Sequence, residues 1–299
     1  MERCRVQLSV LPCPPNTGRK RPVLEARELS KSYGAVKALD TVSFRAVGGE
    51  VIAIVGDNGA GKSTLLKVLS GAITHDTGQL RVGGELVDFR SPHDAEQVGI
   101  EAVYQDLALV NTLDVGSNIF LGREIPRKGM AGRIGLIDRR AMRREGREAL
   151  RDLLGVEFPT MRRTVEMLSG GQRQAVAIVR SASRLEQRGR GVILLDEPTA
   201  ALGVAQRQRV GMLIKRLASK GHLVVIVSHD LPTVFELASR IFVMRLGRLV
   251  TELHANDSDL STLVGLITGA IEPTDITKVV ADDDATASSD INRSSRGTK

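Results

Sequence analysis

The sequence predicts an α/β fold with a largely parallel central sheet, and three observations lead to that prediction. Short runs rich in Val, Ile and Leu alternate with segments of helical spacing through most of the 299 residues. One such run, residues 51–55, passes through a glycine-rich loop into a helical segment. Another, residues 192–195, leads directly into two adjacent carboxylates. Because ligands of doubly wound sheets gather at the carboxyl ends of the strands, both runs are expected to border a functional site.

The expected strands differ in how they pair. The first two and the last two show alternating polarity or a turn between them, such as Leu246-Gly247, and are expected to be antiparallel. The strands in between are expected to be buried and parallel. In chain order, the expected strands are residues 23–29, 38–45, 51–55, 78–82, 192–195, 223–227, 241–245 and 248–252.

One domain is expected over residues 23–271, with a helix-rich insertion at about residues 91–165 between two halves of the sheet. Within that insertion, residues 142–154 carry apolar side chains at helical spacing. Residues 1–22 and 272–299 are expected to be a disordered leader and a disordered tail, because they offer little apolar surface to bury.

Composition narrows the class of protein. The hydrophobic content of 42% is ample for a core, and both cysteines precede the first expected strand, which excludes a disulfide framework and favours a reducing compartment. No apolar run approaches the roughly 20 residues of a membrane span, so a soluble or peripheral protein is expected. The net charge of +7 would suit nucleic acid or an anionic membrane surface. However, the basic clusters at 19–21 and 139–144 fit a basic leader and a solvated helix face.

Residues 56–63 fit the phosphate-loop pattern G-x-x-x-x-G-K-[ST] between a strand and a helix, which is the context that the pattern requires. Its glycines let backbone N–H groups approach phosphate oxygens, and the following helix N-terminus adds partial positive charge. Lys62 is expected to reach the β- and γ-phosphates, and Ser63 to bind Mg²⁺. The residues expected to bind nucleotide are Gly56, Asp57, Asn58, Gly59, Ala60, Gly61, Lys62, Ser63 and Thr64.

Two carboxylates, Asp196 and Glu197, follow the second buried strand. Asp196 is expected to hold Mg²⁺ through water, and Glu197 is expected to polarise the water that attacks the γ-phosphate. The alternative interpretation is an acidic helix start, with Pro198 just inside the helix.

Residues 168–174, Leu-Ser-Gly-Gly-Gln-Arg-Gln, predict a second anion site. Ser169 is placed to cap a helix, and Gly170 and Gly171 expose its first N–H groups. One nucleotide cannot easily use two such sites from a single globular half. We therefore expect Ser169, Gly170, Gly171 and Gln172 to close over the phosphates bound to another copy of the chain.

Taken together, these motifs resemble the nucleotide-binding domain of ATP-binding cassette (ABC) transporters over roughly residues 23–270. The resemblance implies a P-loop NTPase fold with a RecA-like core, an antiparallel β subdomain and a helical subdomain, and it implies ATP and Mg²⁺ as ligands. It also implies that Gln105 senses Mg²⁺, that His229 contacts the γ-phosphate and that Tyr33 stacks on adenine. The implied catalytic residues are Glu197, His229 and Gln105, and the implied metal ligands are Ser63, Gln105 and Asp196.

Two looser segments, residues 118–124 and 199–203, resemble those of bacterial monosaccharide importers of the ribose, xylose and fructose type. Many such importers carry two cassettes in one chain, whereas this sequence has one set of motifs and resembles the single-cassette branch. Gly203 departs from the Asp that many family members have there, which puts a contact across the dimer in doubt. The resemblance implies a homodimer on the cytoplasmic face of the membrane, with permease subunits and, indirectly, a periplasmic or extracellular sugar-binding protein as partners.

The main alternative is a soluble ABC-type ATPase that acts on nucleic acid or the ribosome, which the basic charge balance favours. Such proteins commonly carry tandem cassettes or a long coiled-coil insertion, and neither is apparent, so no nucleic-acid partner is expected. An exporter ATPase is a further alternative, because the cassette by itself does not fix the direction of transport.

Overall fold

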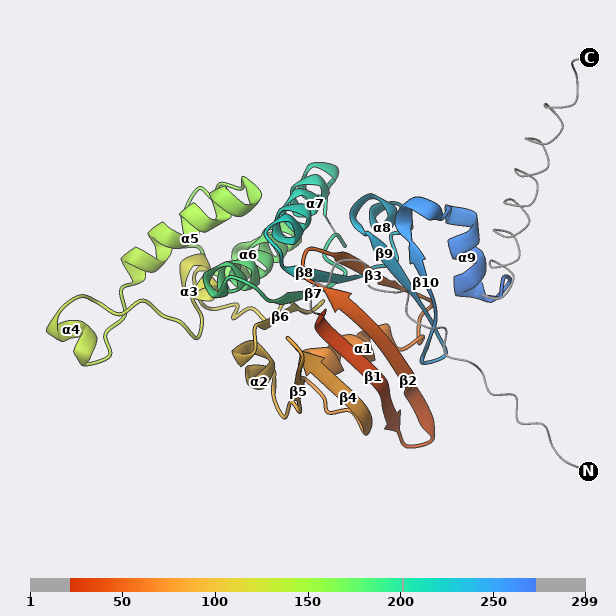
Figure 1. Ribbon diagram of the computed structural model, residues 1–299. Coiled ribbons are helices and arrows are strands. Elements are labelled where there is room, and N and C mark those ends of the chain that lie inside the picture. The colour runs from red at the N-terminus through yellow and green to blue at the C-terminus, as the bar shows by residue number, and fades with distance from the viewer. Residues whose placement is uncertain (1–21, 201, 273–299) are drawn as a thin grey trace, which may run out of the picture.

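The computed structural model describes residues 22–200 and 202–272, and its α/β fold is built around two sheets (Figure 1). The predicted leader and tail lie almost wholly outside the described residues. Within those residues, no helix has both the length and the apolar character that crossing a bilayer requires.

The larger sheet has six strands, and its centre is parallel. Strand β3 pairs in parallel with β8 and β9, β8 with β7, and β7 with β6, whereas β10 pairs antiparallel with β9. Every residue of β3, β7 and β8 is buried, as expected for parallel strands that are covered on both faces. In spatial order, the strands are β10 (Arg248–His254), β9 (Arg240–Arg245), β3 (Val51–Val55), β8 (Leu223–Val227), β7 (Val192–Asp196) and β6 (Ile100–Val103).

The smaller sheet is antiparallel, with the spatial order β2 (Val36–Val47), β1 (Pro22–Tyr33), β4 (Thr77–Val82) and β5 (Glu85–Val87). Its buried side chains share one core with helix α1 (Lys62–Leu69) and with one face of the larger sheet. At that junction the rings of Phe44 and Phe242 lie 5.4 Å apart between centroids. The antiparallel sheet thus packs against the larger sheet, and α1 is buried in the core that the two sheets share.

The other face of the larger sheet is covered by helices, chiefly α6 (Gly170–Arg188) and α7 (Val204–Ser219). Helices α8 (Leu231–Leu237) and α9 (Leu260–Thr268) contribute to the same core. Figure 1 shows α3 (Val115–Ile119), α4 (Met130–Arg133) and α5 (Arg139–Leu154) away from β1 and β2, on the left of the view. The predicted helix at residues 142–154 is confirmed, because α5 spans it and buries Met142, Leu150, Leu153 and Leu154.

Two predictions about strands were wrong. We expected residues 78–82 to be a buried parallel strand, but β4 pairs antiparallel with both β1 and β5 and buries only Leu80. We also placed no strand within the helix-rich region 91–165, yet β6 lies there and pairs with β7. The polar Glu101 interrupts the apolar pattern of β6, although its side chain is buried in the fold. The proposed limits of the helical subdomain stay a prediction.

Candidate nucleotide-binding site

Several of the predicted site residues lie at one edge of the larger sheet. Four adjacent parallel strands, in the order β3-β8-β7-β6, end at this edge. The phosphate loop follows β3, His229 lies just after β8, Glu197 follows β7 and Gln105 lies just after β6. The strand order therefore brings together residues that are far apart in the sequence, at the place where doubly wound sheets bind ligands.

The path of the phosphate loop requires glycine at two positions. Gly56 has φ of 151°, and a Cβ atom there would lie 2.2 Å from the carbonyl oxygen of Met244. Gly61 has φ of 99°, and its Cβ would lie 2.4 Å from the carbonyl oxygen of Ala38. Both values of φ are unfavourable for residues with a side chain. The loop thus lies against strand β9 on one side and strand β2 on the other. Asp57, Asn58 and Gly59 face solvent, Ala60 is buried, and Ser63 and Thr64 lie in the first turn of α1.

Lys62 curls back over the loop that precedes it. Its Nζ donates to the carbonyl oxygens of Gly56 at 2.6 Å and Asp57 at 2.8 Å. Burial lowers the pKa of Lys62, and the carboxylates of Glu197, Asp57 and Asp196 act in the opposite direction. The anionic phosphates of a nucleotide would add to that opposing effect and favour the ammonium form.

Asp196 ends β7 and is only 9% exposed. Burial raises the pKa of this carboxyl group, and the neighbouring Glu197 raises it further, while Lys62 and Lys67 lower it. A divalent cation at this position would stabilise the charged form. Together with the Ser63 hydroxyl and the Gln105 amide, Asp196 would offer the oxygen ligands that Mg²⁺ prefers.

Phosphate oxygens would have to complete such a metal site. Within residues 22–200 and 202–272, no group of three or more His, Cys, Asp or Glu residues is placed to hold a metal ion. This is how Mg²⁺ is usually bound in nucleotide enzymes, through one or two protein ligands and the phosphates of the substrate. The donor set therefore fits Mg²⁺ that arrives with a nucleotide.

Glu197 is held in an unusual backbone conformation beside His229. Its φ is 50°, and its N–H donates to the carbonyl oxygen of Val227 at 2.9 Å. Its Oε1 accepts a hydrogen bond from the backbone N–H of His229 at 3.1 Å and lies 2.7 Å from Nδ1 of the same residue. The His229 side chain is 76% exposed, whereas that of Glu197 is 15% exposed. The carboxylate is thus oriented by the end of β8, with the imidazole beside it open to solvent.

Helix α6 begins at Ser169, as predicted. Ser169 is the N-cap: its Oγ accepts a hydrogen bond from the N–H of Gln172 at 3.3 Å. In return the N–H of Ser169 donates to Oε1 of Gln172 at 3.0 Å, which completes a capping box. Ser169 and Gly170 are exposed, while Gly171 and Gln172 are half-buried. Among the described residues, no hydrogen bond or ion pair joins this turn to the phosphate loop.

Tyr33 lies in the smaller sheet, at the end of β1. It pairs with Val36 across the hairpin, and the two side chains are 51% and 66% exposed. The Nζ atom of Lys31 lies 5.9 Å from the centre of the Tyr33 ring. The same hairpin supplies Ala38, whose carbonyl oxygen faces Gly61. An exposed aromatic ring therefore lies on β1, next to the strand β2 that contacts the phosphate loop.

Comparison with known proteins decides the family. A family model described as "ABC transporter" matches residues 39–200, which is more than half of the chain. The chain belongs to the ABC transporter family. As a member it is an ATP-binding cassette that hydrolyses ATP.

Several relatives of this ABC cassette carry import ATP-binding names. The fructose import ATP-binding protein FrcA of Rhizobium meliloti is 46% identical over 255 residues, which cover 85% of this chain and 96% of that protein. The xylose/arabinose import ATP-binding protein XylG of Sulfolobus acidocaldarius is 42% identical, with coverage of 82% and 94%. The ribose import ATP-binding protein RbsA 1 of Rubrobacter xylanophilus is 41% identical, with coverage of 83% and 47%.

Solved structures support the fold of the cassette. A dimeric ATP-binding cassette in a post-hydrolysis state, bound to ADP and Pi, aligns with a TM-score of 0.66 at 24% identity and covers 78% of this chain and 98% of that one. A nucleotide-free cassette from an ABC transporter aligns with a TM-score of 0.67 at 24% identity, with coverage of 82% and 98%. The predicted P-loop NTPase fold, with its antiparallel β subdomain, is confirmed.

The sequence analysis did not predict the role of two buried polar residues of the cassette, Gln174 and Arg180. Nε2 of Gln174 donates to the carbonyl oxygen of Pro198 at 3.3 Å, which joins α6 to the loop that follows Glu197. Arg180, also on α6, donates to the backbone of the loop that follows Gln105. Both residues lie on an otherwise apolar part of the helix. Buried polar residues in such a run were the available signal, because they are seldom buried without partners.

Gly203 occupies the N-cap of α7, with φ of −69° and open space where a Cβ would lie. Its backbone therefore does not require glycine. The departure from the Asp of many family members has no steric cause in this fold.

Proposed function

We propose that this ATPase energises the import of a sugar through separate membrane permease subunits, at the cytoplasmic face of the membrane. The import ATP-binding names of relatives with 46% and 42% identity, matched over 96% and 94% of their lengths, support this proposal. A sugar-binding protein on the far side of the membrane would deliver the cargo to the permease. No nucleic-acid partner is part of the proposal.

The mechanism that we propose rests on the separation of the phosphate loop from the Ser169 turn. The phosphate loop lies at the carboxyl edge of the larger sheet, and the Ser169 turn begins a different helix with no polar contact to it. Two copies arranged head to tail would each bind ATP between their own Lys62 and the partner's Ser169 turn. The ligand then stabilises the closed dimer, and loss of the γ-phosphate lets the two halves part.

Within each site, the described contacts support a separate role for each residue in binding or hydrolysis. The Glu197 carboxylate would accept the proton of the water that attacks the γ-phosphorus, since it is the oriented carboxylate beside Asp196. Lys62 and the loop N–H groups would stabilise the charge on the β- and γ-oxygens. Asp196, Ser63 and Gln105 would hold Mg²⁺, which when bound neutralises phosphate charge. Tyr33 would stack on adenine.

The test uses the chain assembled with its permease in lipid vesicles. Glu197→Gln should lower kcat for ATP by about 100-fold or more while ATP binding persists, because the change removes the proton acceptor and leaves the phosphate loop intact. Lys62→Ala is the matched control and should weaken ATP binding by about 10- to 100-fold. Unchanged turnover in Glu197→Gln would contradict the catalytic assignment. Stimulation of turnover by RNA or DNA, with none by any monosaccharide and its binding protein, would contradict the transport assignment.

A further inference from the structure

The loop that follows Gln105 contains two consecutive residues in the left-handed region. Leu107 has φ of 61° and Ala108 has φ of 44°, and neither is glycine. Residues with a side chain are unfavourable in this conformation, so two in succession persist only where the surroundings hold them. Within the loop, the N–H of Leu107 donates to the carbonyl oxygen of Tyr104 at 2.9 Å, which closes a tight turn around Gln105.

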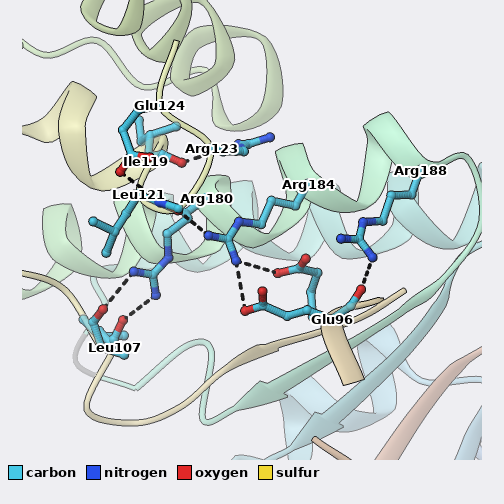
Figure 2. Close-up of polar contacts among 12 residues, drawn as sticks. Glu96, Leu107, Ile119, Leu121, Arg123, Glu124, Arg180, Arg184 and Arg188 are labelled. Atoms are coloured by element: carbon cyan, nitrogen blue, oxygen red, sulfur yellow. Dashed lines mark hydrogen bonds and ion pairs between the residues drawn. The ribbon is translucent and has the colours of Figure 1, made fainter. Parts of the chain in front are cut away.

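The side chain of Arg180, on helix α6, forms hydrogen bonds with the backbone of this turn. Its two terminal nitrogens donate to the carbonyl oxygens of Ala108 at 2.8 Å and Leu107 at 3.0 Å, as Figure 2 shows for Leu107. Arg180 is only 8% exposed. The rigid guanidinium fork suits two neighbouring carbonyl groups, and burial makes such charge-assisted hydrogen bonds strong.

Arg180 differs from the other arginines on the same side of α6. Arg184 binds Glu96 at 3.0 Å and the carbonyl oxygen of Leu121, and Arg188 binds the backbone of Glu96 (Figure 2). Those contacts hold the segments before β6 and after α3. Among the described residues, Arg180 is the side chain of this row that binds the turn after Gln105.

The position of Arg180 connects the two half-sites of one chain. The helix that carries it begins at the N-cap Ser169, about 16 Å away along the axis for a separation of 11 residues. A helix is rigid over that length, so the turn after Gln105 and the Ser169 turn are attached to one body. Gln105 serves the chain's own nucleotide and Ser169 the partner's, according to the function proposed above.

We propose that Arg180 is a positioning residue for Gln105, which keeps the left-handed turn at residues 107–108 in place and couples it to the helix that begins at Ser169. The inference rests on the proposed function for the role of Gln105, but the hold of Arg180 on the turn can be measured without turnover.

The first test compares Arg180→Met with Arg180→Lys in the permease complex. Met keeps the aliphatic length but removes both hydrogen bonds, so kcat should fall by at least about 10-fold. Lys can bind one carbonyl but lacks the fork, and should fall between Met and the parent. The ATP concentration for half-maximal rate should change by less than about threefold, since Lys62 and the phosphate loop are untouched.

The second test is rescue by glycine. Ala108→Gly lets residue 108 adopt its left-handed conformation without a steric cost, so the turn needs less support. In the Ala108→Gly background, Arg180→Met should lower the logarithm of kcat by at most about half as much as it does in the parent chain. Leu246→Gly is the matched control, because Leu246 also has a positive φ, 49°, but is 82% exposed in the turn between β9 and β10. It should give no rescue, whereas a merely structural defect would respond equally to both glycines.

The third test follows hydrogen exchange at the Leu107 amide in the full complex without ATP. Exchange should accelerate by at least about 10-fold in Arg180→Met and return toward the parent rate with Ala108→Gly. Unchanged exchange, or equal rescue by both glycines, overturns the inference and leaves the proposed function standing. Failure of the proposed function has a different signature, namely unchanged ATP turnover in Glu197→Gln.

Discussion

In this ABC cassette, Oε1 of Glu197 lies 2.7 Å from Nδ1 of His229 and also accepts a hydrogen bond from the backbone N–H of that residue at 3.1 Å. Both contacts use one carboxylate oxygen. The other, Oε2, makes no hydrogen bond with the described residues, and is available to a water molecule. His229 thus orients the carboxylate with its main chain and with its side chain, and these two contributions can be separated by mutation.

Replacement of His229 by Ala removes the imidazole and leaves the backbone hydrogen bond in place. We expect kcat to fall by up to about 100-fold, because the carboxylate loses one of its two orienting contacts and the nucleotide loses a neighbouring imidazole. The measurement is a double-mutant cycle on kcat with Glu197→Gln. If the two residues act together, the double variant should be about as slow as Glu197→Gln alone. Independent, multiplying losses would contradict a joint role.

A methyl group at Gly61 should damage the phosphate loop. Its Cβ would lie 2.4 Å from the carbonyl oxygen of Ala38, and φ there is 99°. We expect Gly61→Ala to reduce the free energy of unfolding by about 1–3 kcal/mol and to weaken ATP binding. Gly59→Ala is the matched control, because φ is also positive, 81°, but the Cβ would meet open space. Urea unfolding and ATP titration of both variants measure the difference, and equal effects would argue against the contact with Ala38.

Mixed dimers test which chain completes each site. Ser169 is exposed at the start of α6, so an Arg there would occupy the place of a bound phosphate without disturbing the core. In heterodimers with Ser169→Arg in one copy and Lys62→Ala in the other, both defects fall on the same composite site and the second site stays intact. With both changes in one copy, each site carries one defect. ATP turnover should therefore be substantial in the first arrangement and nearly absent in the second.

The outcome of that experiment has a clear control. Ser169→Ala removes only the N-cap hydrogen bond and should cost about 1 kcal/mol of stability. Its ATP turnover shows how much of the loss in Ser169→Arg comes from removal of the N-cap hydrogen bond alone. Equal ATP turnover in the two heterodimer arrangements would contradict the head-to-tail proposal.

Glu101 should make stability depend on pH. Burial raises the pKa of its carboxyl group to about 7, from the ordinary value of 4.5, although Arg184 acts in the opposite direction. Its Oε1 is buried without a hydrogen-bond partner among the described residues, and its Oε2 lies 3.7 Å from Arg184. Between pH 4.5 and 7 the folded chain therefore binds more protons at this site than the unfolded chain does. Stability attributable to Glu101 falls as pH rises through that window, by up to about 3 kcal/mol.

Glu101→Gln should remove this dependence. From pH 5 to pH 8, the free energy of unfolding of the parent should fall more steeply than that of the variant, as measured by urea titration. Glu148→Gln, on the exposed side of α5, is the matched control and should follow the parent. Parallel curves for the parent and Glu101→Gln would show that the carboxyl group is already ionised in the fold at pH 5.

Local sequence was sufficient where the structural determinant is local. The strand before Gly56, the glycine loop and helix α1 follow one another within a few residues, and each is specified by its own pattern. The cap at Ser169 was predictable for the same reason, since its capping box involves residues three apart. The antiparallel pairs β1–β2 and β9–β10 were predictable because each joins neighbouring segments through a short turn.

Long-range packing decided the rest. The sequence suggested no strand at β6, because Glu101 interrupts its apolar pattern, and only the fold places that carboxylate beside Arg184 of α6. The direction of β4 depends on its pairing with β1 and β5, which its own residues do not encode. The order β3-β8-β7-β6 and the hold of Arg180 on the turn after Gln105 are likewise tertiary. The sequence by itself determined which chemical groups the chain carries, whereas packing of distant segments decided which of them meet. The contact of Arg180 with Leu107, 73 residues apart, cannot be predicted from the local pattern of either segment.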